Sequence, residues 1–259
     1  IKLFFHIAKI KEVNLLSNYY KFVVLYKTDR IRMKRERERI TLAAVIPFFI
    51  VFMIYMLKIL EVGMDWDFTR MGIYPRTQKG VFGIFAHTLI HNSFKHLFAN
   101  TFPLFFLSWC LFYFYKEIAS YIFFFLWILG GIITFLIGKP GWHIGASGLI
   151  YGLAFFLFFS GIIRKHIPLI AISLLITFIY GGLVWNMIPF FAKSTTSWEG
   201  HLSGAIAGIV LAVLFRHNGP QKPNPFKDED KLDDSLNTEK EPSKSEEEQE
   251  TPHSLNENI

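Results

Sequence analysis

Long stretches without a charged residue dominate the chain after position 96, at 97–115, 118–138, 141–163, 167–192 and 200–215. A helix that crosses a bilayer needs about 20 mostly apolar residues. Together with an earlier apolar run, these stretches predict six membrane-spanning helices in an all-α membrane protein. We expect the spans at Leu42–Leu60, His96–Tyr115, Ile118–Ile137, Ser147–Ile163, Ile167–Pro189 and His201–Phe215.

The first span and the connection after it carry the polar exceptions. Pro47 lies near the start of the span, and Lys58 at its end is expected to snorkel toward water. The connection over 62–95 begins with charges and then has an uncharged stretch from Val81 to Phe94. Because that stretch is too short to cross, we expect it to be interfacial or partly submerged.

Charge divides the chain into three parts: a basic N-terminal segment (1–40), the six-helix domain (41–217) and an acidic tail (218–259) that we expect to be disordered and cytoplasmic. Residues 1–218 hold 22 Lys and Arg against 9 Asp and Glu, and residues 219–259 hold 5 against 12, so the net +6 hides +13 and −7. Met33 precedes a charged run and the first span, so we expect it to be the natural start, with 1–32 not native.

Lys and Arg near the span ends predict the orientation. Six spans put both termini on one side. Twelve basic residues fall on that side and six on the other, which favours cytoplasmic termini; the six are Arg70, Arg76, Lys79, Lys95, Lys139 and Lys193. We expect a multi-pass protein of the bacterial plasma (inner) membrane.

Composition excludes several classes of protein. The chain is 52% apolar and 17% aromatic, and its one cysteine, Cys110, has no partner for an internal disulfide. A soluble single domain, a coiled coil and a disulfide-stapled fold do not fit. No basic patch with interleaved aromatic residues indicates a nucleic-acid partner.

The polar residues inside the spans limit the chemistry. Asp and Glu occur only at span ends (Glu61, Glu117, Glu199), so a paired-aspartate protease lacks its carboxylates. No His-Glu dipeptide occurs, which removes the zinc-protease motif. His87 and His91 are four residues apart, but no carboxylate or cysteine joins them, and we expect no metal and no cofactor. His, Asn and Ser remain, the residues of nucleophilic hydrolysis.

Three motifs carry the candidate chemistry. Gly145-Ala146-Ser147-Gly148 opens the fourth predicted span, where Ser147 is either a helix cap or an accessible nucleophile. Tyr151 follows four residues later on the same face. His201 lies at the start of the sixth span, on the face of Gly204 and Gly208, a spacing of small residues that permits close helix contact.

The third motif, His96-Leu97-Phe98-Ala99-Asn100, starts the second span. His96 and Asn100 share a face and can both donate hydrogen bonds, as an oxyanion pocket requires; the alternative is an ordinary polar helix end. His143 and His166 are interpreted as loop or interface residues.

Taken together and in chain order, these motifs resemble the rhomboid family of intramembrane serine proteases, of the basic six-span bacterial type. The resemblance covers roughly residues 42–216. It implies that Ser147 is the nucleophile and His201 the general base and acid of a dyad without a carboxylate. It implies oxyanion donors at Asn100, His96 and the Ser147 amide.

The resemblance also implies supporting roles. Tyr151 would hold the His201 ring, His91 would be a neighbouring structural histidine, and the glycines Gly145, Gly148, Gly204 and Gly208 would permit close packing. Residues 187–199 would form a capping loop and the fifth span a lateral gate. Well-studied relatives carry adjacent Trp-Arg in the first loop, which this chain lacks, and Tyr74-Pro75-Arg76 is a candidate for that structural role.

The resemblance implies cleavage of peptide bonds in or near transmembrane helices of single-span or other membrane proteins, within the lipid bilayer. Two alternatives stay open: an inactive relative that binds membrane helices for quality control, and a His-lined channel or transporter. The presence of both Ser147 and His201 favours activity, and the lack of an internal repeat disfavours a transporter.

Overall fold

The computed structural model describes residues 2–179 and 197–220, which lie within one compact unit. This part of the chain is helical and contains no strand, apart from an isolated bridge between Ile73 and His143. In chain order the helices are α1 (Lys2–Gly63), η1 (Thr69–Met71), η2 (Gln78–Gly80), α2 (Gly83–Ala86), η3 (His87–Leu89), α3 (Phe94–Tyr115), η4 (Lys116–Ile118), α4 (Ala119–Ile137), α5 (Ser147–Arg164), α6 (Ile167–Ile179) and α7 (Trp198–Leu214).

The all-α membrane fold expected from the sequence is confirmed. Three helical segments of the described part are long and apolar enough to cross a bilayer, Tyr19–Gly63, Phe94–Ile137 (α3 with α4) and Ser147–Arg164, and α7 is a shorter apolar helix. Helices α3, α4, α5 and α7 match four predicted spans closely. Helix α1 contains the expected span Leu42–Leu60 within a much longer helix, and the described part of α6 covers the beginning of the expected span Ile167–Pro189. That all six cross the membrane stays a prediction, because α6 is described only to Ile179.

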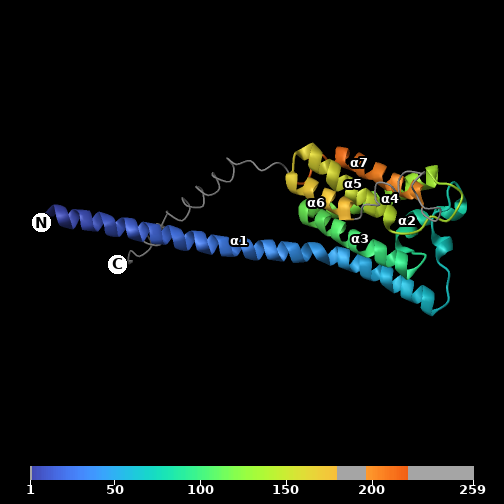
Figure 1. Ribbon diagram of the computed structural model, residues 1–259, viewed down its shortest axis with the longest axis horizontal. Coiled ribbons are helices and arrows are strands. Elements are labelled where there is room, and N and C mark those ends of the chain that lie inside the picture. The colour runs from blue at the N-terminus through green and yellow to red at the C-terminus, as the bar shows by residue number, and fades with distance from the viewer. Residues whose placement is uncertain (1, 180–196, 221–259) are drawn as a thin grey trace, which may run out of the picture. The chain divides into compact units, whose positions relative to one another are not determined.

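Helix α5 is the centre of the bundle. It packs against α3, α4, α6 and α7, with its most extensive contact on α7 (Figure 1). Leu153, Phe156 and Leu157 of α5 are fully buried. The N-terminal end of α5, where Ser147 lies, is therefore fixed from several sides.

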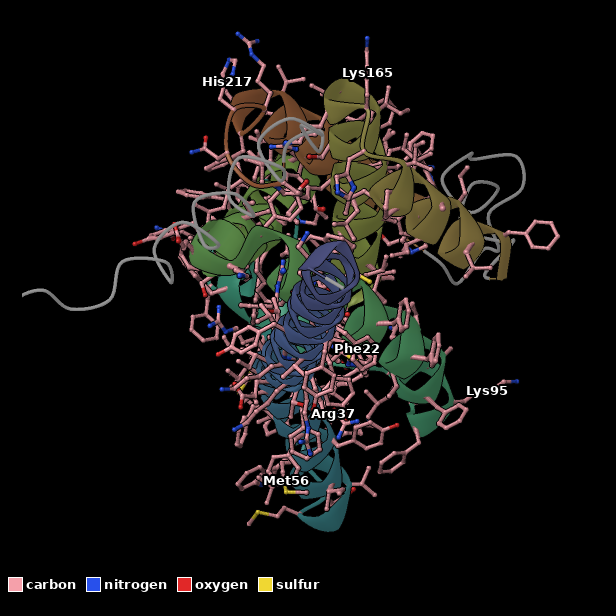
Figure 2. The ribbon with its side chains drawn as sticks, turned by 90° about the vertical axis from the view of Figure 1, so that its left-hand side faces the viewer. Phe22, Arg37, Met56, Lys95, Lys165 and His217 are labelled. Carbon is pink, nitrogen blue, oxygen red and sulfur yellow. The ribbon has the colours of Figure 1, made fainter. Side chains whose placement is uncertain are left out.

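The opposite ends of α5 and α7 are tied together by a buried cation. Arg164 donates to the carbonyls of Phe215 and Asn218 and to the Tyr115 hydroxyl, which bonds Ser160. The next residue, Lys165, ends α5 in the left-handed region at φ 54°. Figure 2 shows the side chains of Lys165 and His217 projecting outward beside these ends. Because their N-terminal ends also meet, α5 and α7 run parallel.

Helix α1 lies beside α3 and continues unbroken through the expected boundary at residue 40/41, so the division into domains stays a prediction. The expectation that Lys58 snorkels is wrong. Lys58 is buried and donates to a Glu61 carboxylate oxygen at 2.9 Å and to the Asn92 carbonyl at 3.3 Å. The carboxylate one turn away and the carbonyl replace water around the ammonium.

The first loop is anchored to the C-terminal end of α4. The Arg76 guanidinium donates to the carbonyls of Leu136 at 3.2 Å and Gly138 at 3.1 Å. A cation at the C-terminal end of a helix satisfies carbonyls that lack helical partners and complements the helix dipole. Arg76 therefore supplies a first-loop anchor in this chain, while Tyr74 packs edge-on against Trp142.

Candidate active site

Ser147 begins α5 immediately after a tight turn. Gly145 has φ +111°, a conformation that favours glycine. A Cβ at Gly145 would lie 2.8 Å from Cε1 of His96, so the His96 ring packs directly on the turn. The structure thereby brings the first residues of α5 against the start of α3.

His201 meets Ser147 from α7. Ser197 caps that helix by accepting from the Gly200 N–H at 3.1 Å, and His201 follows in the first turn, 5% exposed. Nε2 of His201 is 3.0 Å from Oγ of Ser147. This is hydrogen-bond distance for a hydroxyl that donates to an imidazole nitrogen, the arrangement in which a histidine can act as a general base.

Glycines hold the two helices at backbone contact. A Cβ on Gly204 would lie 1.9 Å from the Gly148 carbonyl oxygen, and one on Gly208 would lie 2.5 Å from the Gly152 carbonyl oxygen. Any side chain at Gly204 or Gly208 would push α7 away from α5. The short distance between Ser147 and His201 depends on this absence of side chains.

Tyr151 lies beside the His201 ring, as the resemblance implies. The two ring centroids are 4.3 Å apart and the planes differ by 16°, so the rings stack. The Tyr151 hydroxyl is buried and has no hydrogen-bond partner among the described residues. The contact with His201 is therefore made by the aromatic ring and not by the hydroxyl.

Asn100 and His96 lie one turn apart on α3. Asn100 is buried, and its Nδ2 amide has no hydrogen-bond partner in the described part of the chain. A buried donor of this kind costs free energy unless another group accepts from it. This face of α3 therefore presents the unpaired Asn100 amide near the His96 ring, which packs on the Gly145 turn.

His91 and His87 hold the turn before α5 through hydrogen bonds to its backbone. The Ala146 N–H donates to Nε2 of His91 at 3.3 Å, and the Gly145 N–H donates to the His87 carbonyl at 2.8 Å. Burial lowers the pKa of His91 to about 3 and the pKa of His87 to about 4. Both rings are therefore neutral near pH 7, which lets His91 accept a hydrogen bond.

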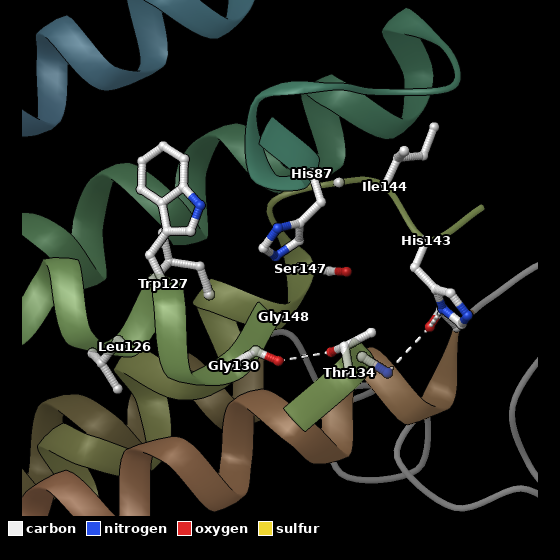
Figure 3. Close-up of a pocket in the computed structure, with 13 residues that line it drawn as sticks. His87, Leu126, Trp127, Gly130, Thr134, His143, Ile144, Ser147 and Gly148 are labelled. Carbon is white, nitrogen blue, oxygen red and sulfur yellow. Dashed lines mark hydrogen bonds between the residues drawn. The ribbon is translucent and has the colours of Figure 1, made fainter. Parts of the chain in front are cut away.

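A small cavity adjoins Ser147. In Figure 3, Ser147 lies between His87 and His143, with Trp127 and Thr134 also lining the cavity. The volume open to a water-sized molecule is about 20 Å³. One water needs roughly 10–15 Å³ of such volume. The Ser147 hydroxyl, which is bonded to His201, therefore faces a space large enough for a water molecule.

Three further expectations from the sequence concern His143, the capping loop and a metal site. His143, interpreted as a loop or interface residue, is 9% exposed and bonds Ser197. Residues 187–196 of the expected capping loop and the end of the fifth span lie outside the described residues. Within the described part, no three His, Cys, Asp or Glu side chains gather in a way that could hold a metal ion.

A family model and one named relative point to the same family. The family model of the Rhomboid domain matches residues 78–218. An uncharacterized protein of Mycobacterium tuberculosis is 40% identical over 152 residues, which is 56% of this chain and 63% of the relative. An uncharacterized protein of Mycobacterium leprae is 33% identical over 171 residues, 63% of this chain and 67% of the relative.

A protein of Acanthamoeba polyphaga mimivirus, whose name describes it as a rhomboid protein, is 29% identical over 149 residues, 54% of this chain and 78% of its own. The match to the Mycobacterium tuberculosis relative spans less than two thirds of that protein's length. The activity, substrates and partners of the whole protein are accordingly matters for proposal.

Proposed function

This chain belongs to the rhomboid family, and on that premise we propose that it is an intramembrane serine endopeptidase acting through Ser147 and His201. The observation that carries the proposal is the 3.0 Å contact between Nε2 of His201 and Oγ of Ser147. Substrates would be single-span or other membrane proteins, cleaved in or near their transmembrane helices.

In the first step, His201 takes the proton of the Ser147 hydroxyl as Oγ attacks the peptide carbonyl carbon. The negative charge that develops on the carbonyl oxygen needs donors, because water is scarce in the bilayer. Asn100 Nδ2, the His96 ring and the Ser147 amide are the candidate donors. The unpartnered amide of Asn100 supports this assignment.

In the second step, His201 returns the proton to the leaving nitrogen, and the amine product departs. His201 then takes a proton from a water molecule whose oxygen attacks the acyl carbon. The ester bond to Ser147 Oγ breaks, His201 returns the proton to Oγ, and the product with the new carboxyl end departs. The cavity lined by Ser147, Thr134 and His143 is where such a water could wait. In this scheme the stacked Tyr151 ring would hold the imidazole of His201 in place.

We propose that the protein lies in the bacterial plasma membrane with both termini cytoplasmic.

Labelling of the detergent-solubilised protein with a fluorophosphonate tests the dyad, with Ser147→Ala and His201→Ala beside wild type. Labelling should be lost in both variants, since each removes one partner of the hydrogen bond. The control is Ser203→Ala. Ser203 lies on α7 like His201, but its hydroxyl donates to the Glu199 carbonyl, so this variant should label like wild type.

The competing function is an inactive relative that binds membrane helices. Folded wild-type protein that neither labels nor cleaves a generic transmembrane substrate would overturn the protease proposal in favour of it. Labelling that persists in Ser147→Ala would also overturn the proposal, because the probe would then report another nucleophile.

A further inference from the structure

A second serine–histidine contact lies beside the first one. Nδ1 of His143 is 2.5 Å from Oγ of Ser197. His143 belongs to the segment that leads into α5, and Ser197 immediately precedes α7. Two contacts thus join the same two segments. In the first, the serine (Ser147) belongs to α5 and the histidine (His201) to α7. In the second, the histidine (His143) precedes α5 and the serine (Ser197) precedes α7.

The partners fix the direction of the hydrogen bonds when His143 is neutral. Nε2 lies 2.9 Å from the Lys139 carbonyl, which can only accept, so Nε2 carries the proton. Nδ1 is then an acceptor, and the Ser197 hydroxyl donates to it. The same Ser197 oxygen accepts from the Gly200 N–H. The chain of bonds runs from the first turn of α7, through Ser197 and His143, to the end of α4.

The His143 ring has little freedom to move. Its backbone exchanges two hydrogen bonds with Ile73, at 2.8 and 3.0 Å. A Cβ on Gly138 would lie 3.1 Å from Nε2 of His143, and one on Gly200 would lie 3.0 Å from Oγ of Ser197. Packing therefore holds Nδ1 of His143 in place, and the bond to Nδ1 holds Ser197, the residue that caps α7.

Since His201 directly follows Gly200, whatever fixes the cap of α7 also fixes the base. We propose that His143 and Ser197 are positioning residues, which hold the first turn of α7 so that Nε2 of His201 stays within reach of Ser147. The inference rests on the proposed function. It requires no contact of either residue with substrate.

Substitutions at His143 separate its two ring nitrogens. In His143→Asn the amide oxygen takes the place of Nδ1, so the bond from Ser197 is kept while that to Lys139 is lost. In His143→Gln the longer side chain puts its amide near Nε2, so the bond to Lys139 is kept while that from Ser197 is lost. His143→Phe removes both bonds at similar volume.

The measurement is the rate of fluorophosphonate labelling, together with kcat and KM for a transmembrane substrate. A misplacement of about 1 Å costs on the order of 100-fold in rate, and we expect kcat and the labelling rate to fall about ten- to a hundredfold in His143→Gln, His143→Phe and Ser197→Ala. KM should change little, and His143→Asn should retain most of the wild-type rate. The double variant His143→Phe with Ser197→Ala should lose no more than either single variant.

Equal losses in His143→Asn and His143→Gln, or additive losses in the double variant, would overturn the proposal. Amide hydrogen exchange over residues 197–203 provides a readout without activity. Exchange should accelerate in His143→Gln and not in His143→Asn. If wild type shows no activity, the protease proposal fails, and unchanged exchange in His143→Gln is the separate result that would refute the positioning pair.

Discussion

Two pairs of neighbouring helices in this protein are held together in different ways. Helices α5 and α7 meet backbone to backbone at Gly148, Gly152, Gly204 and Gly208. Helices α1 and α3 meet through longer polar side chains: the Arg39 guanidinium donates to the Tyr113 carbonyl at 2.9 Å, and Trp109 Nε1 donates to the Ile40 carbonyl at 2.9 Å. In α1, many large apolar side chains remain exposed.

The difference matches the chemistry that each pair carries. Backbone contact leaves no adjustable atom between α5 and α7, so the helices cannot separate or rotate without losing contact along their length. This pair carries Ser147 and His201, whose hydrogen bond tolerates only a few tenths of an ångström. Flexible side chains between α1 and α3 can follow small shifts. Helix α3 carries the proposed oxyanion donors Asn100 and His96, but neither residue of the proposed dyad.

The largest expected effect comes from a methyl group between α5 and α7. Gly204→Ala would place Cβ 1.9 Å from the Gly148 carbonyl oxygen, so α7 must move. We expect labelling and cleavage to fall by on the order of 100-fold or more, with about 1–3 kcal/mol lost from the free energy of unfolding.

Gly130→Ala on α4 is the matched control. Its Cβ would be 3.7 Å from the Gly204 Cα, an ordinary contact, and alanine favours helix by about 1 kcal/mol. Stability should be unchanged or slightly higher in thermal unfolding. If Gly204→Ala behaved like Gly130→Ala, the contrast between the two helix pairs would not stand.

Acid should weaken the region around the proposed site. Burial holds the pKa of His87 at about 4, below the ordinary histidine value of 6.5. Between pH 4 and pH 6.5, His87 therefore binds a proton in the unfolded protein but not in the folded protein. Its contribution to the free energy of unfolding is fully present above pH 6.5 and is lost as the pH drops toward 4, by about 1.4 kcal/mol per pH unit.

His91, with a pKa of about 3, should add a similar loss. The experiment is the thermal midpoint in detergent at pH 7.5 and pH 5, for wild type and His87→Asn. The asparagine can still donate to the Gly83 carbonyl, which Nδ1 of His87 contacts at 2.9 Å. The loss of unfolding free energy between the two pH values, obtained from the shift of the midpoint, should be about 2 kcal/mol smaller in the variant. An unchanged shift would exclude His87 as its source.

The sequence predicted the bounds of α3 and α4 well, because a charged residue stands at each end of both apolar runs. Span Ile118–Ile137 corresponds to α4, Ala119–Ile137, and His96–Tyr115 to α3, Phe94–Tyr115. Helix α7 begins three residues before the expected His201, at Trp198, because the cap at Ser197 extends it. Periodicity does not reveal such a cap.

The site divides in the same way. Ser147, His201 and Gly204 stand in recognisable local motifs, so their proximity could be expected from the sequence. His143 has no such motif, since its partner Ser197 lies 54 residues away and only the tertiary fold brings the two together. Lys58 was misjudged for a related reason: its second acceptor, the Asn92 carbonyl, comes from a distant loop.

The stack of Tyr151 on His201 allows a finer test of the α5–α7 contact. Tyr151→Leu keeps bulk but removes the ring that faces the imidazole at 4.3 Å. Aromatic pairs contribute about 0.5–1.5 kcal/mol beyond the area they bury, so kcat should fall up to about tenfold. Tyr151→Phe should be nearly neutral, because the hydroxyl has no described partner. A large loss in Tyr151→Phe would assign the role to the hydroxyl.

The smallest expected effect is at the α1–α3 pair. The Arg39 guanidinium lies over the Tyr113 ring, 4.4 Å from its centroid, and 3.6 Å from a Glu36 carboxylate oxygen. Arg39→Lys keeps the charge and loses the planar stack, which is worth about 0.5–1 kcal/mol at a half-exposed position. The thermal midpoint should fall slightly while the labelling rate stays at the wild-type value. Arg35→Lys, at an exposed position one turn earlier, should change neither quantity. Because the side chains between α1 and α3 can readjust, a labelling rate that fell as far in Arg39→Lys as in Gly204→Ala would mean that both helix pairs constrain the dyad equally.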